Sequence, residues 1–328
     1  MNNLKKIGLT ALAGCLAVTS VQATTLTASG SASIGFGGAD KGTSANGFYM
    51  NDEVTFSGSG ELDNGWNVTL SMQLDNDETG TGNMDNRSIT IDMGDAGTVA
   101  FGGHGLDSVV GGVDDVMPTA YGETWDIISN TVDNGGVTST ASTLFGAIGS
   151  ASSNNMMRYD NTTAVEGLKI SASYVPSGTG EVESSVDYGL EYTGYEGLTL
   201  GYAMGENNAA GGTGNTDNDT MYVKYAYGPV TVGYQKSEID ANTANDTDEW
   251  DAYGITYAVS DSISVGYAES TYNAGDKATD QENSNLSVSY TAGGMTLAAG
   301  FAEEKNRGGL TTAVNDVKGY DISLAFAF

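Results

Sequence analysis

Apolar residues recur at every second position in one segment of this chain after another. In the stretch GLTLGYAMG, the residues Leu198, Leu200, Tyr202 and Met204 share one parity, while Thr, Gly and Ala fill the other. The stretch GYDISLAFAF at residues 319–328 repeats the pattern and finishes on an aromatic ring. Because successive side chains of a strand point to opposite faces, this period predicts strands with one apolar face and one face of small or polar residues.

The spacing of these segments predicts an all-β architecture of about sixteen strands. The expected strands are 25–36, 50–62, 66–75, 87–93, 97–103, 155–160, 168–176, 184–193, 197–205, 219–227, 229–238, 249–258, 262–271, 284–291, 294–303 and 317–328. Tight turns with Gly, Asn, Asp or Pro alternate with longer connections rich in Asp, Asn, Gly and Thr. An even number of strands of about ten residues is typical of a closed antiparallel transmembrane β-barrel, which leaves no backbone group unpaired in lipid.

The last expected strand has to close on the first in such a barrel. Both strands carry outward apolar residues, namely Leu26, Ile34 and Phe36 on the first and Ile322, Leu324, Phe326 and Phe328 on the last. Tyrosines near strand ends are expected to form girdles at the membrane interfaces. These are Tyr159, Tyr174, Tyr192, Tyr227, Tyr234 and Tyr290.

The first residues predict export. The basic stretch MNNLKK precedes the apolar stretch IGLTALAGCLAVTSV, and VQA ends at a site suited to signal peptidase. We expect residues 1–23 to be a signal peptide and residues 24–328 to be the barrel. As the alternative, LAGC is similar to a lipobox, in which case Cys15 would be retained and lipidated. Cys15 is the one cysteine of the chain, so ordinary cleavage leaves no thiol in the mature protein.

The charge balance excludes nucleic acid as a partner. The sequence has 42 acidic against 12 basic residues, a formal net charge of −30, and the expected signal peptide removes two lysines and no acid. Such a surface repels phosphate backbones and attracts cations.

Three stretches carry a resemblance to a known family. They are SITIDMGDAGTVAFGG, MMRYDNTTAVEGLKISASY and the final LAFAF. Over its mature length the chain resembles a Gram-negative general diffusion porin. The resemblance implies a multi-pass barrel in the bacterial outer membrane and a homotrimer. It also implies that Ile322, Leu324, Phe326 and Phe328 form a signal for the outer-membrane assembly machinery.

The longest interruption of the strand pattern, at about residues 104–154, follows the fifth strand. It is far too long for an ordinary connection and contains enough apolar residues to be packed. By resemblance it folds into the barrel and narrows the channel. It has no Lys or Arg, and its expected constriction acids are Asp107, Asp114, Asp115, Glu123, Asp126 and Asp133.

Parity also predicts the charged residues of the lumen wall. These are Arg158, Asp160, Lys169, Lys224 and Asp92. The family typically sets wall Arg and Lys across from loop carboxylates, and Arg158 is the candidate for that position. Family members often cluster several Arg there, and this chain has one clear case.

These features predict a water-filled pore for passive diffusion of small hydrophilic solutes and ions, with size exclusion by the loop and a preference for cations from the carboxylates. One alternative is a solute-selective channel on the same barrel. Another is an acidic surface β-protein, such as an adhesin or surface-layer component, with Cys15 retained.

The sequence predicts no enzyme and no cofactor. His104 and Ser108 could suggest a hydrolase pair, but nothing marks the orienting group that a nucleophilic site needs. The acid clusters at 75–78, 217–219 and 246–249 could bind Ca²⁺ or Mg²⁺, or bridge through such ions to lipopolysaccharide. The other interpretation of these clusters is that they are solvated outer loops.

Overall fold

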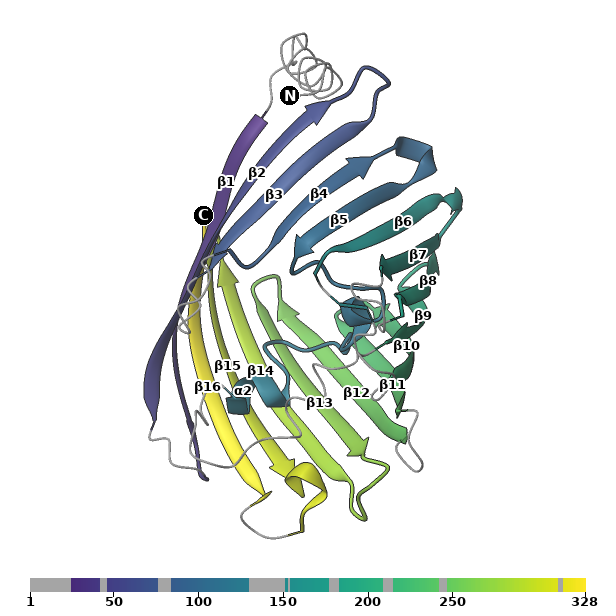
Figure 1. Ribbon diagram of the computed structural model, residues 1–328. Helices are drawn as coiled ribbons and strands as arrows, with labels where there is room; N and C mark the ends of the chain where they lie inside the picture. Colours follow the sequence, from purple (N-terminus) through teal and green to yellow (C-terminus); the bar gives the residue numbers. More distant parts are fainter. Residues whose placement is uncertain are drawn as a thin grey trace, which may run out of the picture.

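A computed structural model describes residues 25–41, 46–75, 84–129, 151–152, 154–176, 183–208, 215–241, 247–311 and 315–328. Its strands form one closed antiparallel barrel in which each strand pairs with its sequence neighbours and β1 closes on β16 (Figure 1). The strands are β1 (Thr25–Ala39), β2 (Gly47–Glu61), β3 (Asn67–Asp75), β4 (Arg87–Asp92), β5 (Thr98–His104), β6 (Met156–Val165), β7 (Leu168–Val175), β8 (Ser185–Tyr195), β9 (Leu198–Asn207), β10 (Thr216–Tyr227), β11 (Val230–Ala241), β12 (Thr247–Ser260), β13 (Ile263–Asn273), β14 (Gln281–Ala292), β15 (Met295–Lys305) and β16 (Val317–Ala327).

All sixteen strands expected from the alternation are confirmed. Several extend past the expected end on the side of the longer connections. For example, β11 was expected to stop at 238 and continues to Ala241. The outward residues there change from apolar to charged, as at Lys236 and Glu238. The alternation of apolar residues therefore ends before the hydrogen-bonded strand does.

The two ends of the barrel differ. Turns of a few residues connect β2 to β3, β4 to β5 and each later even strand to the next, and β1 begins and β16 ends on that side. The longer connections, including the one after β5, start from the other side. The described helices are short, and none has the length and apolarity that a membrane crossing needs.

The outer face is apolar, and the outward residues of β1 and β16 pair with each other, as their parity predicted. Ile34 lies opposite Leu324 and Phe36 opposite Ile322. Among the girdle tyrosines, Tyr227 is strongly exposed, and Tyr234 stacks near Tyr253 with ring centroids 5.0 Å apart. The barrel therefore presents lipid-compatible side chains outward and leaves the opposite parity for the lumen.

A row of charged outward residues lies beyond the tyrosines on the long-connection side. It contains Asp219, Lys236, Glu238, Glu249, Asp251, Glu269, Glu282, Glu303, Lys305 and Lys318. Ion pairs join Lys236 to Glu238 at 3.0 Å and Lys318 to Glu303 at 3.1 Å. This row marks the level of the polar headgroups on β10 to β16.

Candidate functional site

The segment between β5 and β6, residues 105–155, is termed the inner loop. It contains a 3₁₀ turn, η2 (Gly111–Val113), and a short helix, α2 (Thr124–Ser129). Its described part lies inside the barrel, because its backbone and side chains form hydrogen bonds with inward side chains of strands from β6 to β16. This confirms the expectation of a long loop folded inward after the fifth strand.

The first part of the inner loop is held by β6, β7 and β8. Arg158 Nη1 donates to the carbonyls of Asp107 and Ser108 at 3.0 and 3.2 Å. The amide of Val109 donates to Ser173 Oγ at 3.0 Å, and the amide of Val110 donates to Asp187 Oδ2 at 3.1 Å. Buried backbone groups need such partners, so inward polar side chains replace water here.

Gln235 holds the middle of the inner loop. Its side chain on β11 is fully buried, and its Nε2 donates to the carbonyls of Val113 and Asp114 at 2.8 and 3.0 Å. Its Oε1 accepts from the amide of Val116 at 2.9 Å. One amide side chain therefore satisfies three backbone groups of the loop.

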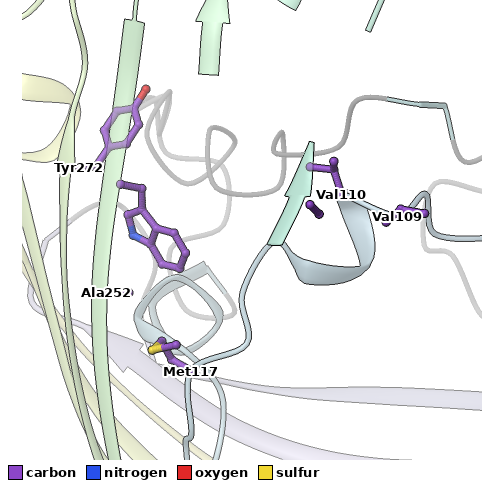
Figure 2. Packing of buried hydrophobic residues seen from close by; sticks show 7 residues of the cluster. Val109, Val110, Met117, Ala252 and Tyr272 are labelled. Carbon is purple, nitrogen blue, oxygen red and sulfur yellow. The ribbon is translucent and has the colours of Figure 1, made fainter. Parts of the chain in front are cut away.

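An apolar cluster supports the same part of the loop (Figure 2). Val109, Val110 and Met117 come from the loop, and Ala252 and Tyr272 come from β12 and β13. Trp250 on β12 is buried in the same cluster. These inward aromatic residues were not predicted as packing sites for the loop.

Glycines on the wall leave room for the loop to approach. A Cβ at Gly254 would lie 2.8 Å from Pro118 Cδ, and a Cβ at Gly233 would lie 2.6 Å from the same atom. A Cβ at Gly300 would lie 2.4 Å from Ile127 Cδ1. The small residues of the inward parity thus form a track along which the loop lies.

The part of the loop around α2 is anchored near the closing strand. Ile127 and Ile128 of α2 are buried against Ala302 and Val317. Asp321 on β16 accepts hydrogen bonds at 2.5 Å from the hydroxyls of Tyr121 on the loop and Tyr49 on β2. The loop therefore extends along the inner wall from β6 to β16.

The described constriction acids influence one another. Burial raises the pKa of Asp114, and the neighbouring charges of Asp107 and Asp126 add to the rise. Burial likewise raises the pKa of Asp115 to about 7, with contributions from Asp114 and Asp126. Burial, followed by a hydrogen bond with Asp126, raises the pKa of Glu123. The structure thus brings these five carboxyl groups into one electrostatic neighbourhood, whereas Asp133 lies outside the described residues.

The inward basic residues lie on the side where the inner loop begins. Arg158 forms a fork to Asp160, with Nε to Oδ2 at 2.9 Å and Nη2 to Oδ1 at 3.2 Å. Lys169 Nζ lies 3.4 Å from Asp160 Oδ1, and Lys224 Nζ lies 5.8 Å from the centre of the Tyr222 ring. Arg158 therefore holds the loop backbone through its Nη1 and forms an ion pair with Asp160.

The wall of β2 and β3 contains an acid that the parity argument left out. Glu53 accepts from Ser31 Oγ at 3.0 Å and from the amide of the Gln73 side chain. Asp92, in contrast, is exposed and accepts from the amide of Gly94 at 2.9 Å, which places it at the turn after β4. It is separate from the acids of the inner loop.

Two residues that organise the site, Gln235 and Asp321, were missed. Both have inward parity and stand among Gly, Ser and Ala neighbours on their strands. A large polar residue on an otherwise small inward face was the signal that could have found them.

Other candidates have local roles. Ser108 is buried, and its Oγ accepts from the amide of Gly111 at 3.0 Å. His104 is exposed at the end of β5. Within the described ranges no group of three or more His, Cys, Asp or Glu side chains is arranged to hold a metal ion; parts of the clusters at 75–78 and 246–249 fall outside those ranges.

Comparison with known proteins gives a family match over nearly the whole sequence. The profile described as "Gram-negative porin" matches residues 8–328. No curated protein matches the sequence.

Solved structures with the same fold include several porins. The chain is similar to the anion-selective porin from Comamonas acidovorans, with a TM-score of 0.71 and 14% identity over 93% of this chain and 100% of that one. It is similar to OmpT of Vibrio cholerae, with a TM-score of 0.64 and 14% identity over 94% and 100%. It is also similar to a mutant of the Rh. blastica porin, with a TM-score of 0.63 and 14% identity over 93% of this chain and 100% of that one.

Proposed function

The chain belongs to the Gram-negative porin family, and from this premise we propose that its outer-membrane channel prefers cations and passes small hydrophilic solutes by diffusion. The family assigns a channel and not an enzyme to the barrel. The finer points, namely ion preference, oligomeric state and natural solutes, are argued from this chain's own residues.

The observation that supports cation preference is the imbalance of charge at the inner loop. Asp107, Asp114, Asp115, Glu123 and Asp126 come from the described loop residues, and the loop sequence supplies no Lys or Arg. On the wall, Arg158 and Lys169 share the carboxylate of Asp160. A cleft lined by one sign of charge raises the local concentration of ions of the opposite sign.

The similarity to an anion-selective porin does not decide this question. At 14% identity the likeness concerns the fold, and selectivity depends on the side chains that line a given pore. In this chain the described residues of the inner loop contribute five acidic side chains and no basic one. We therefore propose that this chain prefers cations although the porin from Comamonas acidovorans, which has the same fold, is anion-selective.

A solute-selective channel is the second candidate, and the inward aromatic residues argue against it. Trp250 and Tyr272 are buried against the inner loop, and Tyr222 donates its hydroxyl to Glu191 at 2.5 Å. These rings are engaged in packing and hydrogen bonding, so they do not form a ladder along the open lumen. Size exclusion by the loop remains the proposed filter.

The remaining partner assignments are also proposals. We expect a homotrimer in contact with lipopolysaccharide, with divalent ions able to bridge outer acidic loops to it, and delivery by the outer-membrane assembly machinery. Residues 1–24 lie outside the described part of the structure. Mass spectrometry of the mature protein should find an N-terminus at or near Thr24, whereas a lipidated Cys15 would support the anchored surface protein.

Liposome swelling tests the proposed function. Vesicles containing the purified protein are diluted into isotonic solutions of a neutral sugar, an amino sugar or a sugar acid of similar size. We expect swelling with all three solutes and the fastest swelling with the cationic amino sugar. Faster entry of the sugar acid would contradict cation preference, and no swelling would contradict an open channel.

A further inference from the structure

The outer face of β2 carries a carboxylate in the middle of an apolar row. The outward residues along this strand are Phe48, Met50, Asp52, Val54 and Phe56. The side is fixed by Phe48, whose ring lies 4.9 Å from the outward ring of Phe36. Within the described residues, no ion pair joins Asp52 to a basic group.

This position is unlike that of the other outward charges. The charged row on β10 to β16 lies beyond the tyrosines, and its members are partly paired, as Lys305 and Glu282 are at 3.4 Å. Asp52 is flanked on both sides by apolar residues. A charge within the lipid-facing belt of a barrel is destabilising. We therefore expect a polar or basic group to shield Asp52 from lipid.

Small residues form part of the outward wall beside Asp52. Ala28, Gly30 and Ala32 follow one another on the outward face of β1, and Ala32 lies opposite Asp52, whereas Ile34, next along β1, lies opposite Met50. Most other strands present Leu, Tyr, Met or Phe at equivalent outward positions. Small residues allow two protein surfaces to approach closely within a membrane.

An outward basic residue lies nearby on β4. Arg87 sits in a groove of about 240 Å³ with Leu70, Ile89 and Phe101 along it. Its side chain passes over Gly103, where a Cβ would lie 3.0 Å from Arg87 Nε. In the described part of the chain, Arg87, like Asp52, has no ion-pair partner.

Asp52 and Arg87 of one chain are too far apart to pair with each other. β3 lies between their strands, which separates them by about 10 Å across the sheet. The register places Arg87 opposite Met72 and Met72 opposite Phe56, four residues along β2 from Asp52, or about 13 Å further. An ion pair needs about 4 Å between the charged atoms, so Asp52 and Arg87 of one chain do not pair with each other.

We propose that this face contacts a second copy of the chain, with Asp52 of one subunit paired to Arg87 in the groove of the next. The two residues lie on the same side of the barrel but on either side of β3. In a ring each subunit then gives Asp52 to one neighbour and Arg87 to the other, as a closed heterologous contact requires. The inference rests on the trimer proposed above and specifies its contact.

Charge reversal tests the pair. Asp52→Arg and Arg87→Asp are made singly and together, and the trimer band is followed on semi-native gels as temperature rises. Each single variant should lose trimer at a lower temperature than the unaltered protein, and the double variant should recover it. As a matched control, Glu282→Arg with Lys305→Glu reverses an outward pair on β14 and β15 and should leave the trimer unchanged.

Crosslinking provides a second readout that does not depend on stability. In a Cys15→Ser background, Asp52→Cys with Arg87→Cys should give oxidised dimers and trimers on non-reducing gels, whereas either single cysteine should not. Unchanged trimers in both single reversals, or no crosslink in the double cysteine variant, would overturn the contact. Loss in Arg87→Asp alone would assign Arg87 to a lipid phosphate and would also overturn it.

The outcomes separate this inference from the proposed function. If the unaltered protein runs as a monomer, the trimer itself is wrong. If it is trimeric but shows no coupling between positions 52 and 87, only the contact is wrong. In either case, conductance of the reconstituted protein reports on the channel independently.

Discussion

The hydroxyl of Tyr121 on the inner loop donates to the carboxylate of Asp321 on β16 at 2.5 Å, which ties the loop to the strand that closes the barrel. Asp321 is fully buried and also accepts from Tyr49 of β2. Loop position and barrel closure therefore share one buried acid.

Tyr121→Phe removes the donor on the loop side and keeps the ring. A hydrogen bond to a charged group contributes about 1.5–3 kcal/mol, and Tyr49 still serves Asp321, so we expect the lower end of that range for loop docking. Single-channel recordings should show larger current fluctuations than those of the unaltered protein. Tyr290→Phe, on the outer face of β14, is the control; equal noise in both variants would contradict the anchoring role of Tyr121.

The pKa of Asp115, raised to about 7 from its usual 3.8, predicts a pH-dependent selectivity. Asp115 gains its negative charge as pH rises through about 7, so cation preference should increase over that range. Asp115→Asn should flatten this step and lower the preference at pH 8, whereas Asp92→Asn at the turn after β4 should keep the step. The measurement is the reversal potential at a series of pH values.

The same shift has a consequence for stability. The pKa of the folded state lies above the usual value, so the protonated form of Asp115 is favoured in the docked loop. The contribution of Asp115 to the stability of the docked loop is fully present below about pH 4 and is lost as pH rises through about 7. Limited proteolysis of the loop should become faster over this range, and Asp115→Asn should remove the change.

Gly254→Leu tests whether the wall glycines seat the loop. A Cβ at this position would lie 2.8 Å from Pro118 Cδ, and the side chain would push the loop toward the lumen. Overpacking of this kind costs about 1–3 kcal/mol, and the single-channel conductance should fall. Ile255→Leu changes a lipid-facing residue of the same strand and should leave conductance unchanged. An unaltered conductance in Gly254→Leu would argue against the track.

Phe328 allows assembly and stability to be separated. Its amide and carbonyl bond to Gly30 of β1 at 3.0 and 2.8 Å, while the residue is 73% exposed. Phe328→Ala should therefore keep the melting temperature of the folded barrel close to that of the unaltered protein. If the ring is part of an assembly signal, the amount of heat-modifiable barrel in the outer membrane should still decrease.

Deletion of Phe328 is the companion variant. It removes both backbone hydrogen bonds to Gly30, so it should lower the melting temperature as well as the yield. A normal amount of Phe328→Ala barrel in the outer membrane would show that the ring is not part of the proposed assembly signal.

The alternation of residues was sufficient to predict the strands and the outward residues of the first and last strands, because each strand has one apolar face and two-residue periodicity. The pairing of Ile34 with Leu324 agrees with that parity, but the register itself comes from the structure. The path of the inner loop could not be predicted in the same way. The stagger of the strands around the barrel decides which inward residue lies next to Val116 or Tyr121. Apart from their polarity, nothing in the sequence around Gln235 and Asp321 indicates that they contact the loop.

The outward face shows a similar limit. Parity assigns Asp52 and Arg87 to the outside, but the interpretation of that face as uniformly lipid-facing overlooks their charge. Only the register shows that they cannot pair with each other within one chain.

The reversal potential of the purified protein in a planar bilayer under a KCl gradient tests the central claim most directly. Stepwise conductance with a potential of the sign set by K⁺ is the result expected of a pore whose inner loop carries uncompensated carboxylates. A potential set by Cl⁻, or no conductance from folded protein, would contradict the cation-preferring channel.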